Sequence, residues 1–254
     1  MDLTDRVAVI TGGGTGIGAA IAHHLVAAGA RGVLVTYSRS EEAAAATVSS
    51  LRALGAQAES VAVDVRADDQ VRALAARCHD VFGGCDVLIN NAASTAWLPF
   101  DDLDAVDDDT WHDILDVNVV GAFRCARAFA PALRQAGGAV VNIASISAHR
   151  GIGSSMPYGV SKAALLQLTR SLAVAMGPEV RVNSVSPGTV ATRWQVDHHG
   201  DEAFDELTAR EREASPLGRT TQPEDVAAAV LGLLGADMIT GVDVVVDAGK
   251  HLMY

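Results

Sequence analysis

A tyrosine and a lysine stand four positions apart, as Tyr158 and Lys162, a short distance after Ser145. On a helix, side chains at this spacing share one face. A free tyrosine titrates near pH ~10, and a neighbouring ammonium lowers that pKa by favouring the phenolate. The set suits proton transfer at Tyr158, with the Ser145 hydroxyl holding a substrate oxygen. A tyrosine and a lysine at this spacing also occur by chance on surface helices, so the surrounding sequence must decide.

A glycine-rich loop lies near the N-terminus, where Gly12, Gly16 and Gly18 follow an apolar run and precede a helical pattern. Glycines let a backbone turn sharply and approach a ligand closely. The N-terminus of the following helix offers unpaired N–H groups and a partial positive charge to a pyrophosphate. The spacing departs from the strict G-x-G-x-x-G fingerprint, but its place between a first strand and a first helix predicts dinucleotide binding.

The end of the second predicted strand favours NADP(H) over NAD(H). NAD-binding folds commonly place an acidic residue there to hold the ribose 2′-hydroxyl. In this chain the place is taken by Tyr37 and Ser38, and Arg39 follows. An arginine with hydroxyl neighbours suits a 2′-phosphate. The alternative is that Arg39 is a solvated charge at the start of the next helix.

Short Val- and Ile-rich runs alternate with longer Ala- and Leu-rich stretches along the chain. The predicted strands are Arg6–Ile10, Gly32–Thr36, Gln57–Val63, Asp86–Ile89, Ala139–Ile143, Arg181–Val185 and Asp243–Val246. The predicted helices are Gly16–Ala28, Glu41–Leu54, Asp68–Phe82, Thr110–Gln135, Pro157–Met176 and Pro223–Leu234. Nearly continuous apolar strands indicate a parallel sheet buried on both faces. We expect an α/β fold over residues 1–254: a single-domain, Rossmann-like doubly wound sheet with helices on both faces.

Two stretches interrupt the alternation. Ser94–Asp109 is polar and acidic, which predicts a surface loop. Thr189–Ser215 follows the sixth predicted strand, where a long insertion is often a mobile cover over a site. We therefore expect residues 189–215 to cover the substrate.

The composition restricts the class of protein. Of the 254 residues, 49% are hydrophobic and 20% charged, as in globular proteins. The net charge of −12 and the absence of a Lys/Arg run disfavour nucleic acid as a partner. Three cysteines without a metal-ligand spacing predict reduced thiols and no metal site. Because we find neither a signal-peptide pattern nor ~20 consecutive apolar residues, we expect a cytoplasmic protein without a membrane partner.

The chain resembles the short-chain dehydrogenase/reductase family over essentially its whole length. The resemblance rests on motifs in the family's order: TGGGTGIG at 11–18, Asp64-Val65, NNAA at 90–93, Asn118, Ser145, YGVSK at 158–162 and SPGTVAT at 186–192. It implies an NADP(H)-dependent enzyme that interconverts a small-molecule carbonyl and a secondary alcohol. It also implies a homotetramer or homodimer, paired through the two longest predicted helices.

The resemblance implies a role for each catalytic residue. Tyr158 would donate the proton in reduction and accept it in oxidation, while Ser145 orients and polarises the carbonyl. Lys162 would hold the nicotinamide ribose hydroxyls and lower the pKa of Tyr158. Asn118 would bind a water that links Lys162 to solvent. Ser147 is a less well spaced competitor for Ser145.

The resemblance also implies the cofactor contacts. Gly12, Gly16 and Gly18 would line the pyrophosphate, Asp64 and Val65 would form the adenine pocket, and Asn91 and Ala92 would run past the adenosine ribose. The remaining expected cofactor residues are Thr15, Ile17, Ser38, Arg39, Pro187, Gly188, Thr189, Val190 and Thr192, the last five at the nicotinamide end. Three of the expected site residues have an alternative interpretation when read alone. Asn118 would be a polar group in a helix, Asp64 a turn residue and Thr192 a helix cap. Lone histidines are more often solvated, so His149, His198 and His199 stay outside the predicted site.

One departure from the family pattern supports an alternative function. Where the family usually has NNAG, this chain has NNAAS at 90–94, and it has ADMITG at 236–241. Both resemble a branch of enoyl-thioester reductases, which reduce a carbon–carbon double bond. The intact Ser145, Tyr158 and Lys162 resemble the carbonyl-reducing majority, such as 3-oxoacyl-[acyl-carrier-protein] reductases. A third hypothesis is a dinucleotide-binding sensor without turnover, which the presence of the three side chains disfavours.

Overall fold

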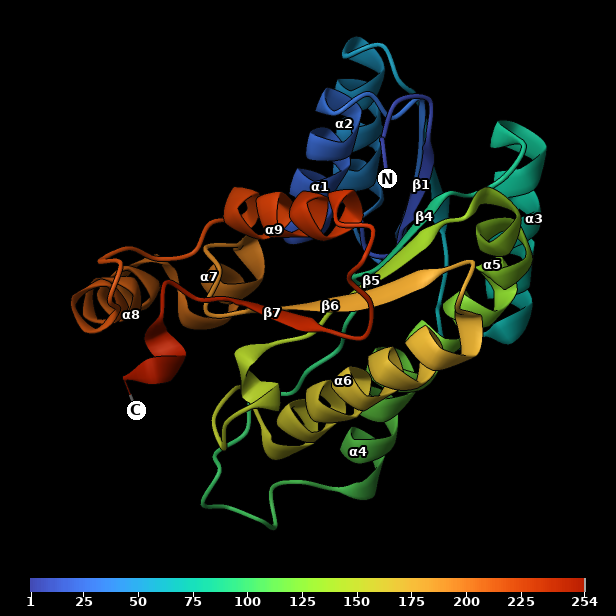
Figure 1. Ribbon diagram of the computed structural model, residues 1–254. Coiled ribbons are helices and arrows are strands. Elements are labelled where there is room, and N and C mark those ends of the chain that lie inside the picture. Colours follow the sequence, from blue (N-terminus) through green and yellow to red (C-terminus); the bar gives the residue numbers. More distant parts are fainter. Residues whose placement is uncertain (254) are drawn as a thin grey trace.

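A seven-stranded parallel sheet runs through the computed structural model, which describes residues 1–253 (Figure 1). The strands are β1 Val7–Ile10, β2 Gly32–Tyr37, β3 Gln57–Ala62, β4 Val87–Asn90, β5 Ala139–Ile143, β6 Arg181–Pro187 and β7 Asp243–Val246. They pair in the order β3-β2-β1-β4-β5-β6-β7, and every pair is parallel. The order reverses between β1 and β4, where sheets of this class open a crevice for ligands. The predicted fold class is confirmed.

Helices cover both faces of the sheet (Figure 1). One face carries α1 Gly16–Ala27, α2 Glu41–Ala53 and α9 Pro223–Gly235; the other carries α3 Asp68–Phe82, α5 Ala122–Ala136 and α6 Met156–Met176. Right-handed crossovers between parallel strands produce this two-sided arrangement. The sheet therefore lies between two separate apolar clusters, one on each face.

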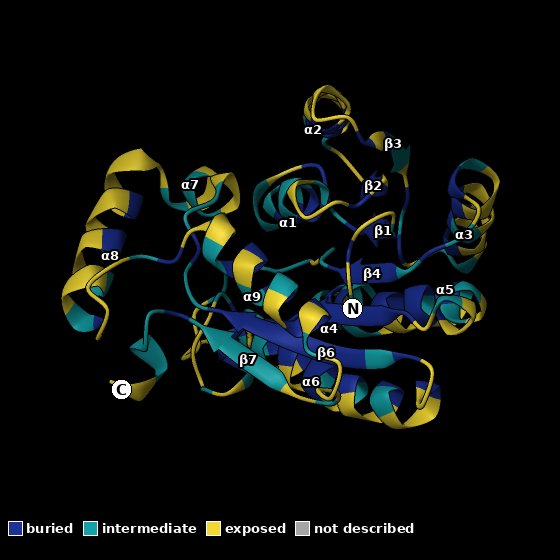
Figure 2. Ribbon diagram, turned by 45° about the horizontal axis from the view of Figure 1, so that its top comes forward, coloured by how far each residue is buried: buried dark blue, intermediate teal, exposed yellow. Residues whose placement is uncertain are grey.

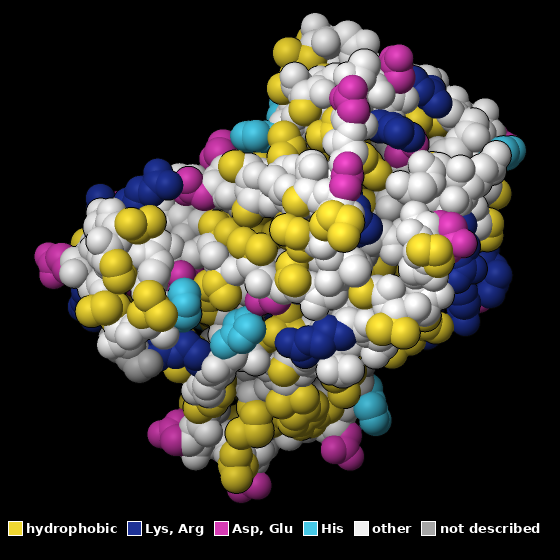
Figure 3. Space-filling view, in the orientation of Figure 1, with side chains coloured by type: hydrophobic (Ala, Val, Ile, Leu, Met, Phe, Trp, Pro, Cys, Tyr) yellow, Lys and Arg dark blue, Asp and Glu magenta, His cyan; other side chains and the backbone are white. Residues whose placement is uncertain are grey.

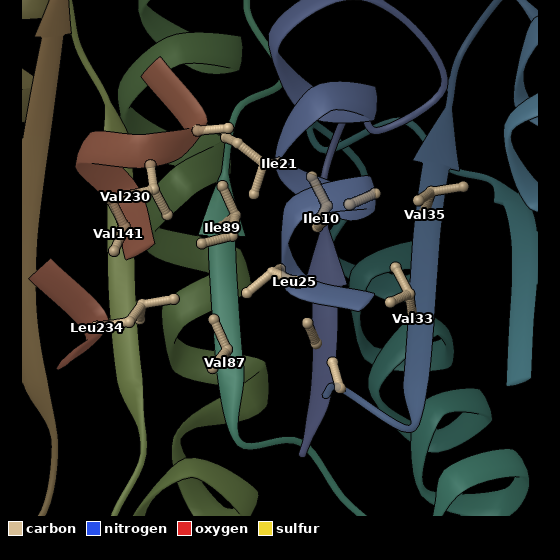
Figure 4. Packing of buried hydrophobic residues seen from close by; sticks show 14 of the residues in the cluster. Ile10, Ile21, Leu25, Val33, Val35, Val87, Ile89, Val141, Val230 and Leu234 are labelled. Atoms are coloured by element: carbon tan, nitrogen blue, oxygen red, sulfur yellow. The ribbon is translucent and has the colours of Figure 1, made fainter. Parts of the chain in front are cut away.

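Figure 4 shows how the first cluster is packed. Ile21 and Leu25 of α1 lie over the central strands beside Val230 and Leu234 of α9, and all four are fully buried. Burying one such side chain stabilises a fold by about 1.5–3 kcal/mol. The inner strands are buried along almost their whole length (Figure 2), but the edge strands β3 and β7 are only partly buried. The expectation of apolar strands is therefore wrong for β3, whose sequence QAESVA mixes polar and apolar residues because one of its edges is open.

The predicted helix Thr110–Gln135 is not continuous. It consists of α4 Asp108–Leu115, one π-helical turn at Asp116–Gly121, and α5. A π-turn inserts an extra residue and is frequent at functional sites. Here it brings Asn118 into the interior, where its side chain is hydrogen-bonded to two other segments.

The insertion after β6 contains helices that the sequence did not predict. They are α7 Arg193–His199 and α8 Asp201–Ala214, separated by Gly200, which has φ = 77°. Helix α8 lies at the far end of the molecule, near the C-terminal residues, and α7 lies between α8 and the body of the fold (Figure 1). Most of α8 is exposed (Figure 2), and α7 buries none of its residues. This construction fits a cover that packs loosely on the sheet.

Within residues 1–253, we find no helix with both the length and the apolar character needed to span a lipid bilayer. The three cysteines Cys78, Cys85 and Cys125 are free and buried. Burial raises the pKa of Cys85 and, to about 12, that of Cys125, so both stay protonated near neutral pH.

Candidate active site

The predicted site residues follow the carboxyl ends of the strands. Asp64 comes after β3, Asn91 after β4, Ser145 after β5 and Gly188 after β6, while the glycine loop follows β1. Because all strands are parallel, these ends meet at one edge of the sheet. Segments far apart in the sequence are thereby brought to the same crevice.

The glycine loop has the shape of a phosphate cradle. Gly12 and Gly16 have positive φ angles of 63° and 52°. A Cβ at Gly18 would lie 2.5 Å from the Gly12 carbonyl oxygen, so the backbone is too close for any side chain. Thr15 caps α1 without a side-chain hydrogen bond, and the first turn holds no acidic residue. The N–H groups of this turn, which includes Ile17, suit a pyrophosphate, so the loop fits the expected dinucleotide.

The segment after β4 braces this loop. The Asn91 amide donates to the carbonyls of Thr11 (3.1 Å) and Gly12 (2.9 Å). The Thr11 hydroxyl accepts from the backbone N–H groups of Asn91 and Ala92, each at 3.0 Å. Thr11 was not among the predicted site residues, although its place between the first strand and the glycine loop was a signal. The predicted contact of Asn91 and Ala92 with the ribose stays a prediction.

The residues predicted to bind adenine carry an ion pair that was not predicted. Arg66 donates to the Asp64 carboxylate from Nε (3.0 Å) and Nη2 (2.7 Å), and its other arm reaches Asp113 at 2.5 Å. These bonds hold the pKa of Asp64 below its usual range, mainly through the Arg66 side chain. The Arg66 N–H also donates to Asp64 (2.9 Å), so Asp64 acts as a turn residue, and its predicted contact with adenine stays a prediction. The adjacent Val65 is buried against Gly121.

At the end of β2, Ser38 and Arg39 are exposed. Among residues 1–253, no hydrogen bond or ion pair involves the Arg39 side chain. Its guanidinium is therefore available to an anion beside the crevice.

The catalytic candidates Ser145, Tyr158 and Lys162 do come together. The Ser155 hydroxyl accepts from the Tyr158 N–H (3.4 Å), which fixes the start of α6 and places Tyr158 in its first turn. Lys162 lies one turn later, with Nζ 5.5 Å from the centre of the Tyr158 ring. The Ser145 hydroxyl lies near enough to the Tyr158 phenol to lower its pKa, and all three side chains are buried. Ser147 is also buried, and its N–H donates to the Ser145 oxygen (3.1 Å).

The electrostatics of this set differ from the expectation. Burial raises the pKa of Tyr158 to about 12, and the nearby Ser145 hydroxyl only partly opposes this. Burial also lowers the pKa of Lys162 to about 7, and its Nζ donates to the Ile143 carbonyl (2.8 Å). Lys162 does not contribute to this shift in the chain alone, so the predicted lowering of the Tyr158 pKa by Lys162 stays a prediction.

Asn118 joins the crevice to α6. Its amide oxygen accepts from the Ser94 N–H (2.7 Å), and its amide nitrogen donates to the Ser94 carbonyl (3.0 Å) and to the Ser161 hydroxyl (2.9 Å). These bonds use both amide hydrogens. They also show that Ser94, predicted to begin a surface loop, is held against the interior. The water predicted at Asn118 stays a prediction, and the backbone carbonyl is the group that could bind it.

The segment after β6 closes the other side of the crevice. Pro187 and Val190 are buried, and Gly188 lies against Asp247, whose Cβ would be 2.7 Å from an added side chain. The Thr192 methyl is 3.3 Å from the place of a Cβ at Gly16, so this segment touches the glycine loop. Thr192 also stands at the cap of α7, as its alternative interpretation predicted, but makes no side-chain cap bond.

An aromatic cluster that sequence reasoning missed lies above Tyr158. The Trp194 ring of α7 meets the Tyr158 ring edge to face, with centroids 6.3 Å apart. Trp97 lies 6.3 Å from Trp194 and stacks on His198 at 3.9 Å. A signal was available, because two of the three tryptophans fall in the two interrupting stretches. His198, left outside the predicted site, belongs to this cluster.

Comparisons with known proteins agree with this geometry. A family model described as "Enoyl-(Acyl carrier protein) reductase" matches residues 12–251. The chain is 40% identical to "Granaticin polyketide synthase putative ketoacyl reductase 2" of Streptomyces violaceoruber, over 97% of this chain and 96% of that protein. It is 38% identical to an A-factor type gamma-butyrolactone 1'-reductase (1S-forming) of Streptomyces virginiae, over 99% and 97%. A crystal structure of a short-chain type dehydrogenase/reductase from Mycobacterium marinum matches with TM-score 0.85 and 33% identity, over 98% and 96%.

Proposed function

The chain belongs to the short-chain dehydrogenase/reductase family, and we propose that it is an NADP(H)-preferring ketone reductase whose proton donor is Tyr158. It is an NAD(P)-dependent oxidoreductase that acts on a ketone or secondary alcohol. The alternative of enoyl-thioester reduction is not favoured, because similar relatives carry the names of ketone reductases. The residue roles, the NADP(H) preference and the assembly below belong to the proposal.

The burial of Ser145, Tyr158 and Lys162 together, beside the glycine loop, is the observation that carries the proposal. The bound dinucleotide supplies the hydride, which adds to the carbonyl carbon. Ser145 donates a hydrogen bond to the carbonyl oxygen, and Tyr158 transfers its proton to the same oxygen. The product is a secondary alcohol, and Tyr158 is left as a phenolate until it regains a proton.

Lys162 lies where its charge can stabilise the Tyr158 phenolate that forms during the reaction. It does not lower the pKa of Tyr158 in the chain without substrate and cofactor. Its ammonium lies one helical turn away, so it stabilises the negative charge when the phenol gives up its proton. Because burial lowers the pKa of Lys162 to about 7, its charge is sensitive to neutral pH. A phenolate next to the charged form of Lys162 raises that pKa again, so the two ionisations assist each other.

The cofactor contacts follow the same geometry. The N–H groups at the start of α1 hold the pyrophosphate, and Asp64 accepts from the adenine amino group with its remaining lone pairs. Arg39 and Ser38 hold the 2′-phosphate at the end of β2, which is the basis of the NADP(H) preference. Pro187, Gly188, Val190 and Thr192 line the nicotinamide end.

We further propose a single catalytic domain over residues 1–254, with 189–215 as the cover, that works as a cytoplasmic homotetramer. Large apolar side chains remain exposed on α5 and α6, including Phe123, Val160 and Val174, which is 85% exposed. Hydrophobic side chains gather over the α6 region in Figure 3. Contiguous exposed apolar surface of this kind often marks contact with another chain.

The direct test follows NADPH and NADH consumption against a 3-oxoacyl thioester, simple ketones, a sugar-like ketone and a 2-enoyl thioester. The proposal expects turnover with ketones, faster with NADPH than with NADH. Turnover of the enoyl thioester alone would reject ketone reduction and point to NNAAS at 90–94 as the feature to mutate. Binding of the dinucleotide without turnover on any ketone would instead support the sensor hypothesis.

A further inference from the structure

The two stretches that interrupt the fold form opposite walls above Tyr158, and the walls are held differently. Trp97 stands on the segment between β4 and α4. Ser94 ties this wall to Asn118 through both backbone groups, and the Leu98 N–H donates to the Ser154 carbonyl (2.8 Å). Hydrogen bonds on both sides of Trp97 therefore fix this wall to the body of the protein.

The opposite wall is α7, whose rings contact the first wall. It buries none of its residues. Its His198 ring lies parallel to Trp97 at 3.9 Å, and its His199 ring meets Trp97 edge to face at 5.2 Å. Trp194 of the same helix contacts both Trp97 and Tyr158. Partial loss of hydration and the neighbouring His199 lower the pKa of His198.

The Trp194 indole covers the acid on which the proposed function depends. Tyr158 keeps only 9% of its surface exposed, and its ring pairs edge to face with that of Trp194, itself 44% exposed. A ketone must lie within hydrogen-bond distance of the Tyr158 oxygen to receive its proton. Substrate binding therefore displaces Trp194 from Tyr158, and the substrate must replace the ring contacts that are lost.

We propose that the substrate is a planar aromatic ketone, whose ring inserts between the fixed indole of Trp97 and the movable indole of Trp194. This inference rests on the proposed function and names its substrate class. An aromatic ring offers the quadrupole that edge-to-face and offset-stacked contacts require, and a saturated ring of the same size does not. Contacts with the substrate ring replace those that the Trp194 indole gives up when its side chain turns aside, while His198 stays stacked on Trp97. A saturated ring fills the same space and offers neither indole an aromatic contact.

The size of the expected preference follows from ring–ring energetics. An aromatic pair contributes a factor of about 2 to 10 beyond the burial of its area. Two indole walls therefore give an aromatic ketone an advantage of about 10-fold over its saturated counterpart. Each wall accounts for about 3-fold of that advantage when the two contribute equally.

The test compares 2-tetralone with trans-2-decalone, two bicyclic ketones whose carbonyls are not conjugated and which differ in one aromatic ring. We expect kcat/KM of the wild type to favour 2-tetralone by about 10-fold. Trp194→Leu and Trp97→Leu should each lower that ratio by about 3-fold, whereas Trp111→Phe, at the third tryptophan, should leave it unchanged. A wild-type ratio near one, or a ratio that neither Leu variant changes, would overturn the aromatic subsite.

A binding measurement separates this inference from the proposed function. Calorimetric titration of both ketones into the NADPH complex reports affinity without turnover. If the protein binds 2-tetralone more tightly than trans-2-decalone and Trp194→Leu weakens this preference, the aromatic subsite is supported, even when neither ketone is reduced. The lack of reduction would then count against the reductase assignment and not against the subsite. Reduction of both ketones with equal affinities would leave the reductase assignment standing and reject the subsite.

Discussion

The cofactor side and the substrate side of the crevice are held in place by different means. On the cofactor side, backbone meets backbone: Gly18 lies against the Gly12 carbonyl, and Asn91 and Thr11 lock the loop by hydrogen bonds. On the substrate side, α7 has no fully buried residue and contacts the opposite wall of the crevice through aromatic rings. The first arrangement tolerates no added atom, and the second can open. Cofactor affinity should therefore depend steeply on single backbone atoms, and substrate choice on replaceable side chains.

The largest effect is expected when one methyl group is added to the closely packed glycine loop on the cofactor side. Gly18→Ala places a Cβ within 2.8 Å of Gly12, Gly13 and the Asn91 amide, so the loop must shift. We expect NADPH affinity to fall by about 100-fold or more, because the pyrophosphate loses several N–H partners at once. Fluorescence titration with NADPH measures this, and circular dichroism checks the fold.

Gly232→Ala is the matched control for that variant. It adds the same methyl on the exposed face of α9, with no atom within 4 Å. It should leave NADPH affinity unchanged and increase the free energy of unfolding by up to about 1 kcal/mol, because alanine favours helix. Equal NADPH affinity in Gly18→Ala and Gly232→Ala would mean that the glycine loop is not a close-fitting cradle.

The second prediction concerns the buried charge at the junction of the two sides. Lys162 has a folded-state pKa of about 7, well below that of an unfolded lysine. Between pH 7 and about 10 the unfolded chain binds more protons, so the free energy of unfolding contributed by Lys162 rises with pH. Lys162→Met removes this dependence.

Urea unfolding of the dinucleotide-free protein at pH 7 and pH 9 tests that prediction. The wild type should gain about 2 kcal/mol more than Lys162→Met between these values. Identical changes in the two proteins would show that Lys162 keeps an ordinary pKa, and with it that the site is more hydrated than the buried geometry implies.

The smallest expected effect is at the outer end of the cofactor side. Removing the exposed Arg39 takes away one charge-assisted contact to a 2′-phosphate, worth about 10-fold in affinity. Arg39→Ala should therefore lower the NADPH to NADH ratio of kcat/KM by about 10-fold, while Arg170→Ala, an exposed arginine on α6, should not. If the ratio in Arg39→Ala equals that of the wild type, another group sets the cofactor preference.

The same contrast explains which elements and site residues could be predicted from the sequence. Strands β5 and β7 and helix α3 have the predicted bounds, because apolar runs and caps mark them locally. Ser145, Tyr158, Lys162 and the glycine loop were identified because backbone geometry and proton chemistry permit few residue types there. Their arrangement in one crevice followed from the parallel sheet.

The features that could not be predicted from the sequence depend on contacts between residues far apart in the chain. The π-turn around Asn118 arises because its side chain bonds to Ser94 and Ser161, which no local pattern records. The pKa of Tyr158 depends on burial by segments that lie far away in the chain. Trp97 and Trp194 fall in stretches without family motifs, and only the fold brings their rings together.

The central claim is that Tyr158 supplies the proton in ketone reduction, and its most direct test is Tyr158→Phe with two readouts. The rate of NADPH oxidation with a ketone that the wild type reduces should fall by about 10²–10⁴-fold, the usual contribution of a positioned proton donor. NADPH affinity, measured by fluorescence titration, should stay within about 2-fold because the glycine loop is untouched. A folded Tyr158→Phe variant with turnover near that of the wild type would contradict the account.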